Sequence, residues 1–242
     1  MDIEEFDLKK IVSASIKDDG WPLNMEFKFI KNSVEQEAVQ GAGIYLISFK
    51  NLIIYIGKFQ PVNRNNIFND RWLRHLETMT FRGYRVGFGR NSLNNDDRMG
   101  EFCGVIINPG LEFALCGRIY HDEPERFKDT GVVTSYNKLR FADQYWDGFV
   151  DLVDNSILTD FSFSLFKFDF SSEQSESIVK QKISNVEKTL LSEFKPVCNR
   201  EYIHNKHYKL PKKNTRNAII EKLINVCDDN QITILKEYLY KG

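Results

Sequence analysis

Two apolar, strand-forming segments separated by only two residues constrain the fold of this chain more than any other feature. Residues 44–49 read IYLISF and residues 52–56 read LIIYI, with Lys50 and Asn51 between them. Isoleucine, tyrosine and phenylalanine favour extended backbone, and a two-residue connection containing Asn is typical of a tight antiparallel turn. The sequence therefore predicts a β-hairpin over residues 44–56, and with it an antiparallel sheet.

The spacing of apolar residues elsewhere predicts helices and a third strand around this hairpin. The alternation in residues 161–170 (FSFSLFKFDF) indicates a strand, and its change of phase between Leu165 and Phe166 suggests a β-bulge. The remaining expected elements are helices over residues 68–79, 139–153, 173–194 and 217–240, and a second hairpin over residues 102–107 and 111–120. We expect an α/β (α+β) fold, with a small antiparallel sheet flanked by helices.

The motifs and the changes in composition suggest one main domain with additions. We expect a core over residues 1–200, in which the first 40 residues are a polar, charged lead-in. The motif-bearing parts of this core are residues 41–80 and 160–200, separated by an inserted region over residues 81–160. Residues 201–242 are expected to form a basic, helical C-terminal extension packed on the same domain.

Composition excludes several classes of protein. The chain has 242 residues, of which 42% are hydrophobic, and no apolar run reaches the roughly 18 residues needed to cross a membrane. Its acidic start lacks the pattern of a signal peptide, so we expect a cytoplasmic protein and no membrane partner. Its 4 Cys form no CxxC pair, and no GxxxxGK[ST] motif is present. We therefore expect no zinc centre and no nucleotide cofactor.

Charge is distributed unevenly although the net charge is only -1. Residues 41–90 carry 8 Lys and Arg against 2 Asp and Glu, and residues 180–242 carry 13 against 7. The segment between these two basic blocks is acidic. Two basic blocks that converge in space would form a face suited to a phosphate backbone, whereas the plainer interpretation is uneven solvation of surface helices.

The tripeptides Gly-Ile-Tyr at residues 43–45 and Tyr-Ile-Gly at residues 55–57 make the hairpin resemble that of the GIY-YIG nuclease family. Further positions match the family in order and spacing, namely Lys58, Arg71, His75, Glu187 and Asn199. The chain departs from compact members in the longer loop before Arg71, where Arg64 could take the arginine role, and in an insertion of about 80 residues before the third strand.

The resemblance implies a metal-dependent DNA endonuclease, most like the type II restriction enzymes of the family. It implies one Mg²⁺ held by Glu187, with Mn²⁺ able to substitute, and double-stranded DNA as the partner. It also implies that Tyr45 lies near the attacking water, that Tyr55 orients it and that Asn199 supports the site. A restriction enzyme often acts as a homodimer so that both strands are cut. A repair or phage-defence nuclease, an RNA-directed nuclease and a non-catalytic nucleic-acid-binding protein remain alternatives.

The residue types suit the same chemistry without the family name. Arg71 and His75 are one helical turn apart, and a guanidinium can neutralise charge on phosphoryl oxygens. Lys58 and Arg71 would lower the pKa of Tyr45 and allow it to accept or relay a proton, although the general base stays undetermined. Glu187 lies in an otherwise apolar helical row, so it must be paired, protonated or metal-bound if buried.

Each of these residues also has a plainer interpretation. The tyrosines could be ordinary strand aromatics, Arg71 a solvated helix residue, His75 structural, and Glu187 the partner of a core Lys or Arg. We expect any DNA contacts to come from basic side chains of the glycine-rich loop, the first helix and the C-terminal extension. These candidates are Arg74, Arg82, Arg85, Arg90, Lys212 and Lys213.

Overall fold

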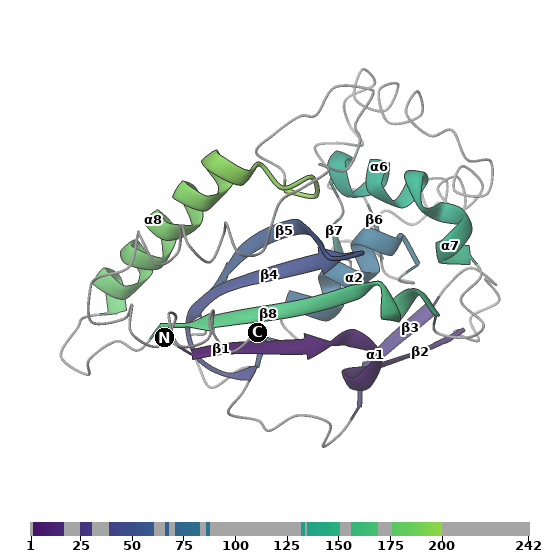
Figure 1. The fold of residues 1–242 in the computed structure, drawn as a ribbon, viewed down its shortest axis with the longest axis horizontal. Helices are drawn as coiled ribbons and strands as arrows, with labels where there is room; N and C mark the ends of the chain where they lie inside the picture. The colour runs from purple at the N-terminus through teal and green to yellow at the C-terminus, as the bar shows by residue number, and fades with distance from the viewer. Residues whose placement is uncertain are drawn as a thin grey trace.

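A four-stranded antiparallel sheet lies at the centre of the computed structural model of this protein (Figure 1). Its strands follow the order β1 (Asp2–Asp7), β8 (Phe161–Lys167), β4 (Gly43–Phe49) and β5 (Leu52–Phe59). The structure describes residues 2–16, 25–30, 39–60, 66–67, 71–82, 86–87, 132–133, 135–150, 156–168 and 176–199. The expected antiparallel sheet flanked by helices, and hence a mixed α and β fold, is confirmed for these residues.

The predicted hairpin is formed by β4 and β5. Lys50 and Asn51 connect the two strands with positive φ angles of 50° and 62°. Two successive residues with positive φ make the kind of tight turn whose twist matches that of the strands, and Asn tolerates this conformation well. The register shifts between Ile47 and Ser48, so that Ile54 of β5 has no opposite partner.

The β-bulge predicted in the third strand is wrong. Strand β8 pairs without a shift with β4, from Gly43 opposite Lys167 to Phe49 opposite Phe161. The phase change at Leu165 and Phe166 arises because both sides of the sheet are covered at this end of the strand. Leu165 packs in one hydrophobic cluster and Phe166 in the other, and both are fully buried.

The expectation that the first 40 residues are only a lead-in is also wrong. Strand β1 pairs along its full length with β8, so the N-terminal segment completes the central sheet. It is followed by the short helix α1 (Leu8–Ile11) and by the antiparallel pair β2 (Val12–Ile16) and β3 (Met25–Phe29). The charged residues of β1 concealed this strand because they remove the apolar alternation on which the sequence interpretation relied.

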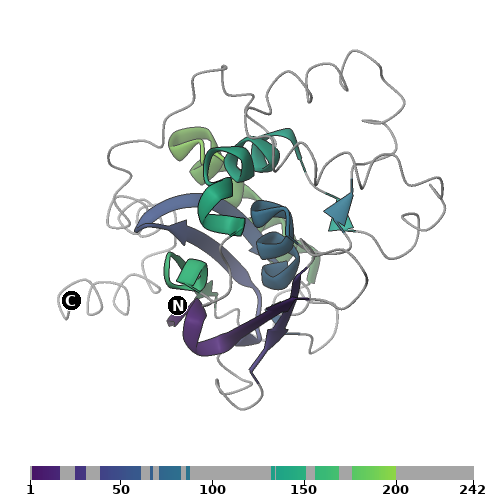
Figure 2. The ribbon, with the colours of Figure 1, turned by 90° about the vertical axis from the view of Figure 1, so that its right-hand side faces the viewer.

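Helices cover both faces of the sheet. The long helix α8 (Glu176–Phe194) packs on one face, while α2 (Leu73–Thr80), α6 (Tyr136–Gln144) and α7 (Trp146–Val150) lie on the other, as Figures 1 and 2 show. The predicted helices over residues 68–79, 139–153 and 173–194 are therefore confirmed in substance. The described fold also contains three short elements, the 3-10 helix η4 (Ser156–Thr159) and the parallel strands β6 (Val86–Gly87) and β7 (Val132–Val133).

The amphipathic pattern of α8 explains its position. Its buried residues Ile183, Val186, Leu190 and Leu191 recur at helical spacing and pack on β4 and β5. The helix ends where Lys195 takes a positive φ of 44° and donates its backbone N–H to the carbonyl of Leu191, directly before Pro196.

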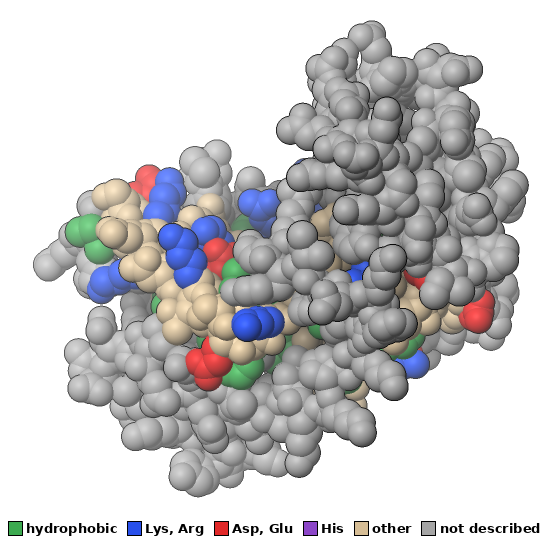
Figure 3. Space-filling model, turned by 90° about the horizontal axis from the view of Figure 1, so that it is seen from above, with side chains coloured by type: hydrophobic (Ala, Val, Ile, Leu, Met, Phe, Trp, Pro, Cys, Tyr) green, Lys and Arg blue, Asp and Glu red, His purple; other side chains and the backbone are tan. Residues whose placement is uncertain are grey.

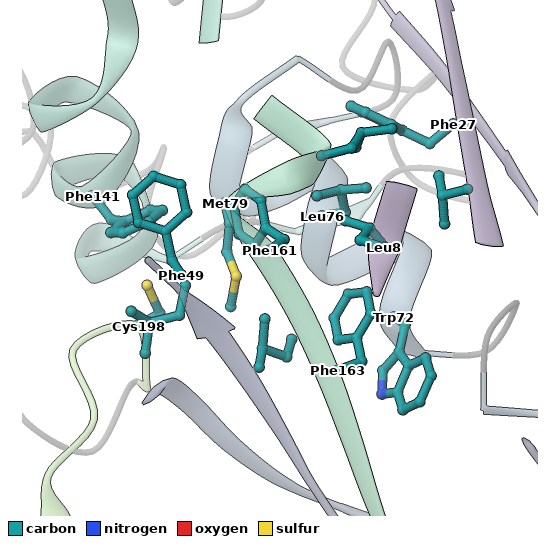
Figure 4. Packing of buried hydrophobic residues seen from close by; sticks show 14 of the residues in the cluster. Leu8, Phe27, Phe49, Trp72, Leu76, Met79, Phe141, Phe161, Phe163 and Cys198 are labelled. Atoms are coloured by element: carbon teal, nitrogen blue, oxygen red, sulfur yellow. The ribbon is translucent and has the colours of Figure 1, made fainter. Parts of the chain in front are cut away.

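On the opposite face, aromatic side chains position α2 and α6 against the sheet (Figure 4). Trp72, just before α2, stacks on Phe163 of β8 with ring centroids 4.6 Å apart and an interplanar angle of 6°. Phe141 of α6 meets Phe49 of β4 edge to face at 5.1 Å. These contacts place one face of α2 over the strands that carry the two tyrosines of the hairpin.

Two other predicted features, the second hairpin over residues 102–120 and the final helix over residues 217–240, lie outside the described residues. The C-terminal extension of residues 201–242 lies outside them as well. Within the described part of the chain, every helix is too short or too polar to span a membrane.

Candidate functional site

Two tyrosines and a histidine from three different elements meet on the α2 face of the sheet. The hydroxyl oxygen of Tyr45 on β4 lies 2.7 Å from Nε2 of His75 on α2. Tyr55 on β5 stacks beside Tyr45 with ring centroids 5.9 Å apart, and its ring centroid lies 4.2 Å from that of His75. Tyr45 is 2% exposed, whereas Tyr55 and His75 are partly buried. The predicted candidates Tyr45, Tyr55 and His75 are therefore in direct contact.

The glycines of the two tripeptides are required by this packing. Gly57 is the partner of Tyr45 across the hairpin, and a Cβ atom there would lie 2.5 Å from both Cζ and the hydroxyl oxygen of Tyr45. A Cβ at Gly43 would overlap the backbone carbonyl of Phe166 on β8. A methyl group at either position would force apart the strands or the tyrosine rings, so local sterics explain why both positions hold glycine.

Lys138 of α6 is a member of this cluster that the sequence interpretation missed. Its ammonium nitrogen lies 2.8 Å from Nδ1 of His75 and 2.9 Å from Oγ1 of Thr78, and 5.3 Å from the centre of the Tyr55 ring. It is 8% exposed. No motif or spacing marks this lysine, because it lies outside the motif-bearing residues 41–80 and 160–200 and reaches the site only through the packing of α6 on α2.

Burial decides the protonation of the two central groups. Desolvation raises the pKa of Tyr45 well above its ordinary value, and Tyr55 and, more weakly, Glu187 add to this, while Arg71 lowers it. The expectation that nearby cations lower the pKa of Tyr45 is therefore wrong in its net sign. Desolvation, together with the charges of Lys138 and Arg71, lowers the pKa of His75 well below its ordinary value. Near neutral pH the pair consists of a phenol and a neutral imidazole.

Arg71 lies in the turn directly before α2, with its side chain exposed. Its charge acts on both Tyr45 and His75, and within the described residues no ion pair neutralises it. An exposed guanidinium beside a tyrosine hydroxyl is suited to an anionic group such as a phosphate. Arg74, one turn further on, is also exposed, while the competing Arg64 lies outside the described residues.

Glu187 and Lys58 lie on the other face of the sheet, where α8 packs. Lys58 is paired with Ile44 in the hairpin register, so its side chain points away from the face of Tyr45. Its ammonium nitrogen lies 2.9 Å from Oε2 of Glu187 and 3.2 Å from Oγ of Ser184. The side chain of Glu187 is 17% exposed. The plainer interpretation of Glu187, pairing with a lysine, is what this structure contains.

The donor set around Glu187 suits only a largely hydrated cation. In the described residues, no group of three His, Cys, Asp or Glu side chains converges anywhere. Oε2 of Glu187 is engaged by Lys58, which leaves Oε1 as the oxygen that could hold a metal. Mg²⁺ retains several waters and is commonly bound through one or two carboxylates, so this oxygen fits a hydrated Mg²⁺ and not an all-protein cage.

Asn199 supports β5 from outside the sheet. Its Oδ1 accepts the backbone N–H of Ile56 at 3.0 Å, and its Nδ2 donates to the carbonyl of the same residue at 2.7 Å. The neighbouring Cys198 donates its backbone N–H to the carbonyl of Ile54 at 2.9 Å. The side chain of Asn137 on α6 in turn donates to the backbone carbonyl of Asn199. Asn199 thus satisfies the free edge of β5 between Tyr55 and Gly57.

Arg82 is buried, which does not fit the DNA contact that the sequence predicts for it. It is 2% exposed, and its guanidinium donates to the backbone carbonyl of Phe149 at 2.8 Å. Desolvation lowers its pKa to about 10. A side chain buried in this way holds α7 against the end of α2 and cannot reach a phosphate backbone. The other candidates Arg85, Arg90, Lys212 and Lys213 lie outside the described residues.

Basic side chains also gather on the outer face of α8. Figure 3 shows this face, where lysine and arginine side chains lie along the helix among few acidic ones. The exposed lysines of this segment are Lys180, Lys182, Lys188 and Lys195. Lys180 forms an ion pair with Glu176 one turn away, so part of the charge is balanced locally.

Comparisons of the chain with models of protein families, with curated proteins and with solved structures found no match.

Proposed function

We propose that this protein is a metal-dependent endonuclease that hydrolyses DNA phosphodiester bonds, most like a type II restriction enzyme of the GIY-YIG family. The observation that carries the proposal is the hydrogen-bonded pair of Tyr45 and His75, with the charge of the exposed Arg71 acting on both. The order of these residues along the chain and the two sterically required glycines match the motif pattern by which the chain resembles the GIY-YIG nucleases.

The residues divide the work of hydrolysis in a consistent way. Attack by water on phosphorus needs a group that takes a proton and a cation that stabilises the negative charge developing on the phosphoryl oxygens. Tyr45 would relay this proton, accepting it from the water while its own hydroxyl proton passes to a phosphoryl oxygen of the substrate; its hydroxyl contacts His75 and is acted on by the charge of Arg71. Arg71 is the group placed to bind the phosphoryl oxygens. Tyr55 orients the reacting groups by packing against both rings.

Glu187 and Lys58 act from the α8 side. When bound at Glu187, Mg²⁺ would supply positive charge for the phosphate and for the leaving oxygen. Lys58 contributes a second positive charge beside the same carboxylate. The exposed lysines of α8 and Arg74 would contact the DNA backbone, which positions the duplex without reading its sequence. Cleavage of both strands would require two copies of this site, so a homodimer on double-stranded DNA is part of the proposal.

The test is cleavage of plasmid and phage DNA with Mg²⁺ or Mn²⁺, with EDTA, and with Glu187→Gln. The matched control is Glu176→Gln, since Glu176 lies on the same helix with its side chain 70% exposed. We expect discrete fragments from the natural protein and the control, and none with EDTA or Glu187→Gln. A smear of products would argue for a nonspecific repair or defence nuclease, and preferential cleavage of competing RNA would argue for an RNA-directed enzyme.

A second candidate is a non-catalytic nucleic-acid-binding protein. The ion pair between Lys58 and Glu187 favours it, because it neutralises the carboxylate without a metal. Tight DNA binding in a gel-shift assay, with no cleavage under any metal condition and with modified DNA also tried, would support this candidate. Metal-dependent cleavage that is lost in Glu187→Gln would exclude it.

A further inference from the structure

The Lys138 ammonium contacts groups from both α2 and β5. The acceptors are Nδ1 of His75 at 2.8 Å, Oγ1 of Thr78 at 2.9 Å, and the face of the Tyr55 ring at 5.3 Å from its centre. Thr78 can donate its own hydroxyl proton to the backbone carbonyls of Arg74 or His75, at 2.9 and 3.0 Å. The lysine is thereby held in one position within a buried site.

This contact determines which nitrogen of His75 carries the proton. An ammonium group has three donors and no lone pair, so Nδ1 of His75 must be the acceptor in the 2.8 Å contact. The proton of a neutral imidazole then lies on Nε2, which is 2.7 Å from the hydroxyl oxygen of Tyr45. His75 therefore donates to Tyr45, and the hydroxyl proton of Tyr45 points away from His75.

We propose that Lys138 is a positioning residue of the site, which holds His75 as the Nε2–H tautomer and so makes it a donor to the Tyr45 oxygen. This inference rests on the proposed function for its catalytic meaning, since a donor at this place stabilises a phenolate on Tyr45. In this tautomer His75 cannot accept a proton, because Nδ1 is occupied by Lys138 and Nε2 has no free lone pair. The region inserted into the core thus supplies part of the site.

The charged and titratable groups around His75 are compatible with a neutral ring. Lys138 from α6 and Arg71 from the turn before α2 both oppose a positive charge on it. Tyr45 from β4 and Tyr55 from β5 are phenols that contact the ring. Glu187 of α8 acts on Tyr45. None of the described groups that contact His75 offers the carboxylate that would favour an imidazolium.

The direct test is the tautomer of His75 by NMR. The protein has 4 His, so the signals of His75 are assigned as those that disappear in His75→Gln. Long-range nitrogen–proton correlation spectra separate a protonated from an unprotonated ring nitrogen. In the natural protein at pH 7.5 we expect a neutral ring with the proton on Nε2. A proton on Nδ1, or on both nitrogens, would overturn the proposal without any use of activity.

Substitution of the lysine supplies the second arm. Lys138→Met keeps an unbranched side chain one atom shorter and removes the donor, so we expect the His75 spectrum to change to a mixture of tautomers or to the Nδ1–H form. The guanidinium of Lys138→Arg can donate but cannot accept a hydrogen bond, so this variant should keep the Nε2–H form of His75. The control is Lys28→Met, since Lys28 is exposed on β3 away from the site. Unchanged His75 signals in a folded Lys138→Met protein would overturn the proposal.

Activity distinguishes this inference from the proposed function. We expect Lys138→Met to reduce kcat by about tenfold to a hundredfold, by analogy with the loss found when a group that orients a metal-bound histidine is removed, with little change in KM. Lys138→Arg should recover most of this loss. An absence of DNA cleavage in the natural protein would refute the nuclease, while the predicted tautomer and its loss in Lys138→Met would still support the positioning role. Cleavage with full kcat in Lys138→Met would refute that role alone.

Discussion

Replacement of Asn199 by alanine tests whether this side chain holds the edge of the sheet. Asn199 is 3% exposed, and its amide makes two hydrogen bonds to the backbone of Ile56, which is fully buried. Alanine lacks the amide oxygen and the amide nitrogen that form these two hydrogen bonds, so both are lost together. The contact from Asn137 is unaffected because it reaches the backbone carbonyl of residue 199. The substitution therefore leaves one buried N–H and one buried carbonyl of β5 without a partner.

The magnitude follows from the number of groups left unsatisfied. Each buried polar group without a partner costs about 1–3 kcal/mol, so the free energy of unfolding should fall by about 2–6 kcal/mol. For a chain of this size, about 2–4 °C of melting temperature is lost per kcal/mol, which gives about 4–24 °C. Total stabilities of about 5–15 kcal/mol mean that the upper part of this range would leave the protein marginally folded.

The assay is urea denaturation followed by circular dichroism and tryptophan fluorescence, on the natural protein and two variants. The control is Asn185→Ala, at an exposed position of α8 whose backbone carbonyl accepts a hydrogen bond from the hydroxyl of Thr189. A surface substitution of this kind should change stability by at most about 0.5 kcal/mol. If Asn199→Ala is no more destabilising than Asn185→Ala, the argument that Asn199 completes the edge of β5 is refuted.

Two other predictions concern the tyrosine cluster. Gly57→Ala should displace the Tyr45 ring and reduce nuclease activity by at least about a hundredfold, the lower end of what a general acid or base contributes. The matched Gly148→Ala, where a new Cβ meets nothing within 4 Å, should leave activity and fold intact, and equal activity of the two variants would contradict the steric argument. The lowered pKa of His75 predicts a stability that falls on acidification. Below pH about 6.5 the unfolded chain binds a proton that folded His75 does not, so stability should decrease by up to about 1.4 kcal/mol per pH unit until the folded pKa is reached. Urea titrations at pH 7.5 and 5.5 should show a smaller decrease in His75→Gln, and an identical decrease would rule out His75 as its source.

Features with local causes could be predicted from the sequence. The hairpin follows from two strand-forming segments and a two-residue turn, and α8 follows from the helical spacing of Ile183, Val186 and Leu190. The motif spacing singles out Tyr45 and His75, and the structure brings them to hydrogen-bond distance. These predictions needed only the number of residues between similar side chains, since backbone geometry converts spacing into a shared face.

Features that depend on packing between distant segments could not be predicted from the spacing of residues along the chain. Strand β1 carries charges that hide its alternation, and it became a strand because β8 offered a free edge. Arg82 has the same appearance in the sequence as Arg74, yet one is buried against Phe149 and the other is exposed. The change of phase in the apolar alternation of β8 suggested a bulge. It arises instead because the strand is buried on both faces at this point.

The hairpin, the long helix and the order of the residues that suggest phosphodiester chemistry follow from the sequence alone, because each depends on neighbours along the chain. The contact of Lys138 with His75 and the pairing of Glu187 with Lys58 arise from packing between segments that are far apart in the sequence. The tertiary structure also raises the pKa of Tyr45, since desolvation in a packed interior outweighs the charge of Arg71. Protonation and pairing depend on burial and on distances through space, and neither quantity is encoded in the spacing of residues.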